Sequence, residues 1–141
     1  MRTFLDTSVL VATFYSDHVH HSAILDLFLR FGKDGACCGA HSLAEVSGTL
    51  TCMPPPRRVG GAEALLFLED VQANLSVIAL NASDYVEAIH SAASQSVFGG
   101  GIYDALLTQC ALKANAEAIY TLNEKHFVRL SPKIGSLVRS P

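Results

Sequence analysis

Apolar residues along the chain follow two repeats, one typical of helices and the other of short buried strands. In the segment 20–31 they recur at helical spacing, at Ile24, Leu27, Phe28 and Phe31. Short apolar runs without that spacing, such as residues 75–80, are typical of strands. On this pattern we expect strands at residues 3–5, 36–40, 75–80, 118–122 and 127–130. We expect helices at residues 8–14, 20–31, 42–51, 62–72, 82–94 and 102–114.

Turn-forming residues mark several boundaries between these elements. Asn81 is expected to cap the helix 82–94, with Asp84 three residues further on. Residues 32–35, Gly-Lys-Asp-Gly, predict a turn. The three glycines at 99–101 lack the lysine and the spacing of a phosphate-binding loop, so we interpret them as a tight turn into the next helix.

The alternation of strands and helices indicates a parallel sheet with helices on both faces. We therefore expect an α/β fold, a three-layer α/β/α sandwich around a mainly parallel sheet. A chain of 141 residues is long enough for one domain with a substantial core. Because no internal repeat or linker interrupts it, we expect a single domain over residues 1–141.

Composition narrows the class of protein. Half of the residues are hydrophobic and 16% are charged, which is typical of a folded globular chain and not of a disordered one. No apolar run approaches the roughly 20 residues of a membrane helix, and Asp6 interrupts the apolar start as a secretory signal would not. We expect a cytoplasmic protein with no membrane segment.

The four cysteines, at 37, 38, 52 and 110, lie in apolar stretches and show no paired CxxC spacing. Such residues are most often buried, reduced thiols in a cytosolic protein. We therefore expect neither a disulfide nor a zinc site.

Charge is distributed unevenly. The net charge is −3, which argues against general coating of nucleic acid. Residues 1–104 nevertheless have a net charge of −6, whereas residues 105–141 have +3 and include Lys125, Arg129, Lys133 and Arg139. This basic C-terminal segment is either a contact for a phosphate backbone or a solvated surface, and both interpretations stay open.

Polar side chains follow the expected strands at the positions where ligands gather in open α/β sheets. Asp6 follows the first strand, Glu45 lies in the helix after the second, Asp104 lies early in the helix 102–114, and Asn123 follows the strand 118–122. Three carboxylates brought together would repel one another unless a cation lay among them. A hard divalent cation with oxygen ligands is the natural partner, so the pattern suggests metal-assisted phosphodiester chemistry.

Each acid also has a purely structural explanation. Asp6 is placed to cap the following helix, and Ser42 with Glu45 matches a capping box. Asp104 in a first helical turn would interact favourably with the helix dipole. Taken together these explanations weaken, because independent caps need not cluster at one end of a sheet.

Histidines offer a weaker alternative for a site. His18, His20 and His21 form an H-x-H-H motif, but no matching Cys or His partner accompanies it. We interpret this motif as the start of a helix whose histidine side chains face solvent. His126 could approach a site near Asn123, whereas His41 and His90 are expected to be structural.

Four segments occur in an order that resembles the PIN-domain nucleases, most closely the VapC-like toxins of bacterial and archaeal toxin–antitoxin pairs. They are residues 5–11 (LDTSVLV), 43–46 (LAEV), 101–106 (GIYDAL) and 120–127 (YTLNEKHF). The resemblance covers nearly the whole chain. It implies an α/β/α sandwich, an endoribonuclease that depends on Mg²⁺ or Mn²⁺, a homodimer and a cognate antitoxin.

By position, the resemblance assigns the acidic site to Asp6, Glu45 and Asp104. Asp6 and Asp104 are expected to bind the metal directly, and Glu45 to hold a second metal or orient the attacking water. Supporting hydrogen bonds are expected from Thr7, Ser8, Thr121 and Asn123. The family often has aspartate at the fourth position, where this chain has Asn123, so tight binding of a second metal is in doubt.

Three rival interpretations remain open from the sequence. A haloacid-dehalogenase-like phosphatase needs a second Asp two residues after the first, where this chain has Ser8. A phospho-acceptor receiver domain needs an acidic pair around the first strand and a lysine late in the sheet, and neither is clear. The third is a catalytically weak PIN fold that binds RNA or protein, which metal-dependent RNA cleavage would distinguish.

Overall fold

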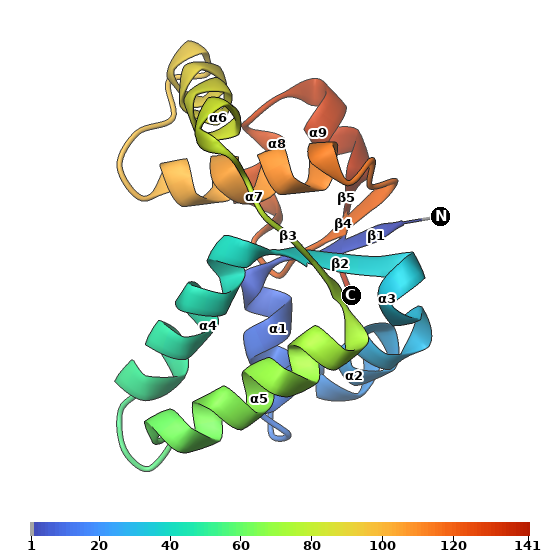
Figure 1. The fold of residues 1–141 in the computed structure, drawn as a ribbon, viewed down its shortest axis with the longest axis vertical. Coiled ribbons are helices and arrows are strands. Elements are labelled where there is room, and N and C mark those ends of the chain that lie inside the picture. The colour runs from blue at the N-terminus through green and yellow to red at the C-terminus, as the bar shows by residue number, and fades with distance from the viewer. Residues whose placement is uncertain (1) are drawn as a thin grey trace.

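The computed structural model describes residues 2–141 and contains a five-stranded, all-parallel sheet (Figure 1). The strands lie in the order β3-β2-β1-β4-β5, so β1 is central. Their bounds are β1 Thr3–Leu5, β2 Ala36–Gly39, β3 Ser76–Ile78, β4 Ala118–Tyr120 and β5 Val138–Arg139. The central place of β1 puts the residue that follows it, Asp6, at the middle of the carboxyl edge.

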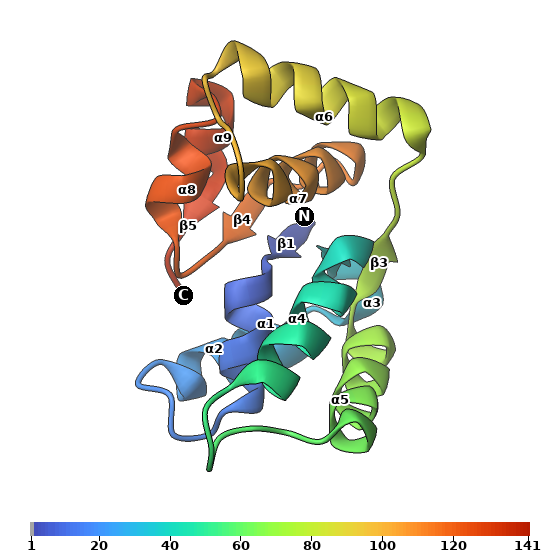
Figure 2. The same ribbon diagram turned by 90° about the vertical axis from the view of Figure 1, so that its left-hand side faces the viewer.

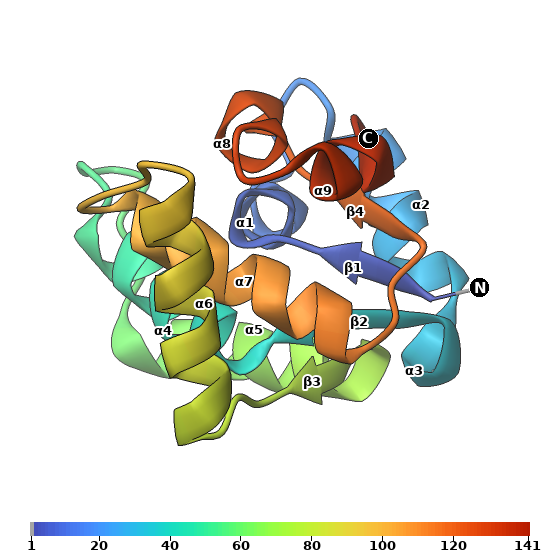
Figure 3. The same cartoon turned by 90° about the horizontal axis from the view of Figure 1, so that it is seen from above.

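Helices cover both faces of this sheet (Figure 1). One layer consists of α1 Thr7–Phe14, α2 His21–Arg30, α4 Ala40–Cys52 and α5 Gly61–Asn74. The other consists of α6 Ala82–Ser94, α7 Gly101–Lys113, α8 Glu124–Val128 and α9 Pro132–Leu137, with α6 lying on α7 (Figures 2 and 3). The short helix α3, Gly32–Gly35, leads from α2 into β2. The expected three-layer α/β/α sandwich is confirmed.

Two cores form because neighbouring strand residues point to opposite faces. Leu5 and Cys38 pack with α1, α2, α4 and α5, whereas Phe4 and Cys37 pack with the helices of the other layer. All four residues are fully buried. Burial on both faces explains why the strands are short apolar runs and not alternating ones.

The expected cap of α6 is confirmed and is a complete capping box. The side chain of Asn81 accepts a hydrogen bond from the Asp84 amide at 2.9 Å, and the Asp84 carboxylate accepts one from the Asn81 amide at 2.9 Å. The helix covers residues 82–94, as its sequence predicts.

The start of α4 differs from the expectation. The helix begins at Ala40 with Gly39 as its cap, so Ser42 is a buried residue of the first turn and forms no capping box with Glu45. A Cβ at residue 39 would lie 2.9 Å from Leu107 Cδ2 and 3.2 Å from Cys110 Sγ. The close packing of α7 on the end of β2 thus requires glycine, and the chain turns directly into the helix.

The expected edge strand at 127–130 is wrong. That segment belongs to α8 and the turn after it, and the edge strand is β5, which follows α9. Phe127 in α8, Leu130 in the following turn and Ile134 in α9 are all buried in the α6–α9 core. The segment 32–35 is likewise one turn of helix, α3, where we expected a non-helical turn.

The four cysteines are free thiols, as expected. Cys37, Cys38 and Cys110 are buried, but Cys52 is exposed at the end of α4, so the expectation of burial is wrong for this one residue. No helix within residues 2–141 has both the length and the hydrophobicity of a membrane span.

Candidate active site

Asp6 lies at the carboxyl end of β1 and caps α1, and its residue is only 3% exposed. Oδ1 accepts hydrogen bonds from the Val9 amide at 3.2 Å and from Ser8 Oγ at 2.6 Å. Oδ2 accepts one from Thr121 Oγ1 at 2.6 Å. The capping interpretation is therefore correct but incomplete, because a cap needs none of the hydroxyl contacts.

The segment after β4 is clamped onto the end of β1 by the same hydroxyls. Thr121 Oγ1 accepts a hydrogen bond from the Asn123 amide at 2.9 Å, and Ser8 Oγ accepts one from the Leu122 amide at 3.0 Å. Two segments more than a hundred residues apart in the sequence are thereby held at one point. The side chains of Ser8 and Thr121 make these contacts, whereas Asn123 takes part through its backbone amide.

Glu45 faces the site from α4. The hydroxyl of Thr7 lies 3.0 Å from Glu45 Oε1, to which it donates, and 2.9 Å from Ser42 Oγ. His41 Nε2 lies 3.9 Å from the same carboxylate, and the His41 ring stacks on Tyr103 with centroids 5.1 Å apart. His41, which we expected to be only structural, thus borders the site.

Asp104 lies in the first turn of α7 and faces the side chains of His126, in α8, and of Arg129, in the turn after it. Its Oδ2 is 3.5 Å from His126 Nδ1 and 3.9 Å from Arg129 Nη2. Gly101 makes the approach of Arg129 possible, because a Cβ there would lie 2.5 Å from Arg129 Nη2. The approach of His126 to the site agrees with expectation, and one residue of the basic C-terminal segment reaches it as well.

The acids affect one another electrostatically. Burial raises the pKa of Asp6, and the negative charge of Asp104 adds to this, while hydrogen bonds from Ser8, Thr121 and Val9 oppose it. Burial also raises the pKa of Asp104, where Glu45 adds repulsion and His126 and Arg129 oppose it. The folded chain therefore disfavours the negative charge at both positions, chiefly through burial and in smaller part through repulsion between the acids.

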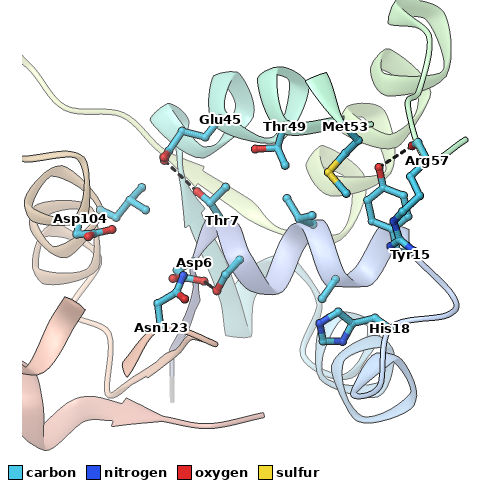
Figure 4. A pocket seen from close by; sticks show the side chains of 14 residues that line it. Asp6, Thr7, Tyr15, His18, Glu45, Thr49, Met53, Arg57, Asp104 and Asn123 are labelled. Carbon is cyan, nitrogen blue, oxygen red and sulfur yellow. Dashed lines mark hydrogen bonds between the residues drawn. The ribbon is translucent and has the colours of Figure 1, made fainter. Parts of the chain in front are cut away.

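A cleft of about 380 Å³ joins these groups (Figure 4). The three acids line it together with Thr7, Ser8 and Asn123. The structure thus brings Asp6, Glu45 and Asp104 to one cleft from the end of β1, from α4 and from α7. The shared cleft is the observation that separate helix caps would not explain.

The donor set suits a hard divalent cation. All three acids offer carboxylate oxygens, and Thr7, Ser8 and Asn123 add neutral oxygens at the same cleft. Within residues 2–141, no three His, Cys, Asp or Glu side chains form a preassembled metal cage. Mg²⁺ does not need one, because it keeps several waters and is usually bound through one or two carboxylates. The residues present therefore fit such an ion.

Sequence reasoning missed the residues at the far end of the cleft. Beyond the acids it is lined by Tyr15, His18, Thr49, Met53 and Arg57. Tyr15 and Arg57 follow α1 and α4, in connections without periodic pattern, so only the folded chain reveals their position. Of the H-x-H-H motif, His18 lines the cleft, a role that we did not expect.

Comparison with known proteins agrees with this geometry. The family model of the PIN domain matches residues 3–131. Ribonuclease VapC40 of Mycobacterium tuberculosis is 34% identical over 114 residues, which cover 81% of each chain.

Solved structures share the fold at low identity. The M. tuberculosis toxin VapC20, described as cleaving the sarcin–ricin loop, superposes with a TM-score of 0.70 at 17% identity, over 88% of this chain and 92% of that one. VapBC2 of Rickettsia felis, solved with a DNA fragment from its promoter, gives 0.68 at 19% identity over 100% and 99%. None of these comparisons favours the phosphatase or receiver-domain alternative.

Proposed function

The chain belongs to the PIN-domain family, and we propose that it is a divalent-metal-dependent endoribonuclease, the toxin of a toxin–antitoxin pair. The observation that carries this proposal is the cleft shared by Asp6, Glu45 and Asp104. Its acids come from three separate elements, and two of them have raised pKa values. Family membership supports the same conclusion, since the relatives are named as a ribonuclease and as an RNA-cleaving toxin.

We assign the ion to Asp6 and Asp104, with Glu45 either at a second ion or beside the attacking water. The chemistry that Mg²⁺ or Mn²⁺ supplies when bound is polarisation of a phosphoryl oxygen and a lower pKa of water. The side chains prepare the site for this chemistry. Ser8 and Thr121 hold both oxygens of Asp6, and Thr7 orients Glu45. Fixed carboxylates need no reorganisation when the ion and substrate arrive.

Asn123 limits the proposed metal stoichiometry. It lines the cleft, and its backbone amide donates a hydrogen bond to Thr121 Oγ1, which leaves its side-chain amide out of that contact. An amide oxygen can accept a hydrogen bond or face a cation, but it contributes no charge. We therefore propose one tightly bound ion, with any second ion bound more weakly than where aspartate occupies this position.

The partners follow from the family. We propose a cognate antitoxin as the regulator of this chain, because VapBC2 of Rickettsia felis has the same fold. We also propose a homodimer. Exposed apolar residues on α6, among them Val86 and Ile89, are consistent with a surface that another chain covers.

The test of the proposed function is cleavage of RNA by the purified protein. Total RNA is incubated with the protein in Mg²⁺, in Mn²⁺ and in EDTA, and the new 5′ ends are mapped by sequencing. We expect discrete ends in either metal and none in EDTA. Equal cleavage in EDTA would overturn the metal dependence, and no cleavage under any condition would favour the catalytically weak alternative.

A further inference from the structure

The cleft continues past the acids along α1 to a second group of side chains, Tyr15, His18 and Arg57 (Figure 4). We call these three residues the distal group. Thr49, Met53, Val11 and Ala12 line the cleft between it and the acids, and none of these four side chains is charged. The cleft thus has an acidic end and an end that contains arginine.

Arg57 is held in place by its surroundings. Its guanidinium lies over the Tyr15 ring, 4.4 Å from the centroid, and Tyr15 Oη donates a hydrogen bond of 3.0 Å to the Arg57 carbonyl. The Val59 amide donates to the Leu50 carbonyl at 3.0 Å, which fixes the same connection to the end of α4. A guanidinium held in this way loses little conformational freedom when it binds an anion.

The present partner of Arg57 is a carboxylate that an anion can replace. Arg57 Nη1 donates to Asp17 Oδ2 at 2.6 Å, and the side chain of Asp17 is 67% exposed. Ion pairs with this exposure contribute little net stability. Arginine binds phosphate as readily as carboxylate, through the same planar set of donors. The pair therefore marks an anion site that the chain itself fills weakly.

The spacing suits a nucleic-acid strand. The eight residues of α1 lie between Asp6 and Tyr15, and the nine steps from one to the other give a rise of about 13 Å at roughly 1.5 Å per residue. Successive phosphates of one strand are about 3.4 Å apart along a stacked duplex and farther apart when the strand is extended. A strand with one phosphate at the acids therefore places another, a small number of nucleotides away, at Arg57.

We propose that Arg57 binds a phosphate of the RNA strand that flanks the bond to be cleaved, displacing Asp17, and that Tyr15 positions Arg57 for this contact. The inference rests on the proposed function, since it names how the same cleft engages its substrate. It also gives the direction of the strand's path, away from α7 and along α1 toward the connection between α4 and α5. Asp17 then acts as an internal competitor for the substrate phosphate.

The test measures binding separately from cleavage. All proteins contain Asp104→Asn and are kept in EDTA, so that RNA stays intact and repulsion in the cleft is reduced. A short fluorescent oligouridylate is the probe, and its Kd is measured by anisotropy over a range of salt concentrations. Arg57→Ala is compared with Arg58→Ala, because the neighbouring Arg58 is exposed, bonds the Met53 carbonyl and does not line the cleft.

We expect Arg57→Ala to weaken binding about tenfold, as for loss of one charge-assisted contact, and Arg58→Ala to change it less than twofold. The slope of log K against log salt should fall by about 0.7 for Arg57→Ala alone, the value for one phosphate contact to a single strand. Arg57→Lys should give an intermediate Kd. Thermal melting of each variant checks that it is folded.

Asp17→Asn tests the same inference in the opposite direction, since this variant should bind RNA more tightly. Removing the competitor should tighten binding several-fold, whereas Asp26→Asn, which removes an exposed carboxylate paired with Arg30 on α2, should not. Equal Kd values and equal salt slopes for Arg57→Ala and Arg58→Ala would overturn the inference, as would no measurable binding by the parent protein. Arg57-dependent binding by a chain that cleaves no RNA would support the inference and overturn only the proposed function.

Discussion

Thr121 Oγ1 donates a 2.6 Å hydrogen bond to Asp6 Oδ2, joining residues 115 positions apart in the sequence. Both residues are buried, and Thr121 also accepts a hydrogen bond from the Asn123 amide. This contact connects the ends of the two adjacent central strands, β1 and β4. It holds the Asp6 carboxylate in one orientation at the cleft.

Thr121→Val is predicted to destabilise the protein by about 1–3 kcal/mol, because a buried carboxylate and a backbone amide both lose a partner. Thr108 is the matched control. It is also buried, and within the described residues its Oγ1 has no hydrogen-bond partner, so Thr108→Val should be neutral or stabilising. Urea denaturation compares the two variants. An equal loss in the free energy of unfolding for both variants would show that the Thr121 contact adds no stability beyond packing.

Asp104→Asn is predicted to be at least as stable as the parent chain in EDTA at neutral pH. Burial raises the pKa of Asp104 above its ordinary value of 3.8. The folded chain therefore binds the proton more tightly, and the free energy of unfolding falls as pH rises from that value through the folded pKa. The variant should become more stable than the parent chain as pH rises between these two pKa values, and it should stay more stable at higher pH.

Urea denaturation of both proteins across pH, in EDTA, measures that advantage. At pH below the ordinary value the two should differ little, because the carboxyl is protonated in both states. A parent chain more stable than the variant at neutral pH would mean that the contacts with His126 and Arg129 outweigh burial.

Iodoacetamide is predicted to label one thiol of the native protein rapidly. Cys52 is exposed. Burial raises the pKa of Cys37 to about 11, of Cys38 to about 12 and of Cys110 to about 11, and thiolate is the reactive form. Mass spectrometry should find one adduct at mildly alkaline pH and none in Cys52→Ser. An intramolecular disulfide, or several rapid adducts, would contradict this.

Asn123→Asp is predicted to tighten Mn²⁺ binding, because the added carboxylate supplies a full charge at the same cleft. The backbone amide of residue 123, which donates a hydrogen bond to Thr121 Oγ1, is unchanged by the substitution. Calorimetric titration of both proteins gives affinity and stoichiometry. Identical values would show that residue 123 is not near the ion, and weaker binding would show that repulsion among the acids prevails.

Most of the architecture could be predicted because strands and helices have different apolar spacings. The strand β1 and the helix α6 begin and end at the residues that the sequence pattern predicts. The C-terminal part failed because a short segment such as 127–130 fits either spacing, and in the fold it forms the end of α8 and a turn, in a helix that packs against α7, α9 and β5. The close approach of Leu107 and Cys110 to Gly39, just before α4, is a tertiary constraint that no local pattern contains.

The acids of the site could be found because Asp6 follows a strand and Glu45 and Asp104 lie in the first two turns of helices, near the edge where parallel sheets gather polar groups. Arg57 could not, because its connection has no periodicity and its position depends on Tyr15, 42 residues earlier in the chain. Arg129 could be identified only as part of a basic segment. Its approach to Asp104 depends on the space that Gly101 leaves.

The most direct test of the account compares two aspartates that each lie in the first turn of a helix. Asp104 in α7 lines the cleft, whereas Asp84 in α6 caps its helix and pairs with Lys113 away from it. Cleavage of single-stranded RNA in Mg²⁺ is measured for the parent chain, Asp104→Asn and Asp84→Asn. We predict a loss of about a hundredfold or more for Asp104→Asn and little change for Asp84→Asn. Undiminished cleavage by Asp104→Asn would contradict the account.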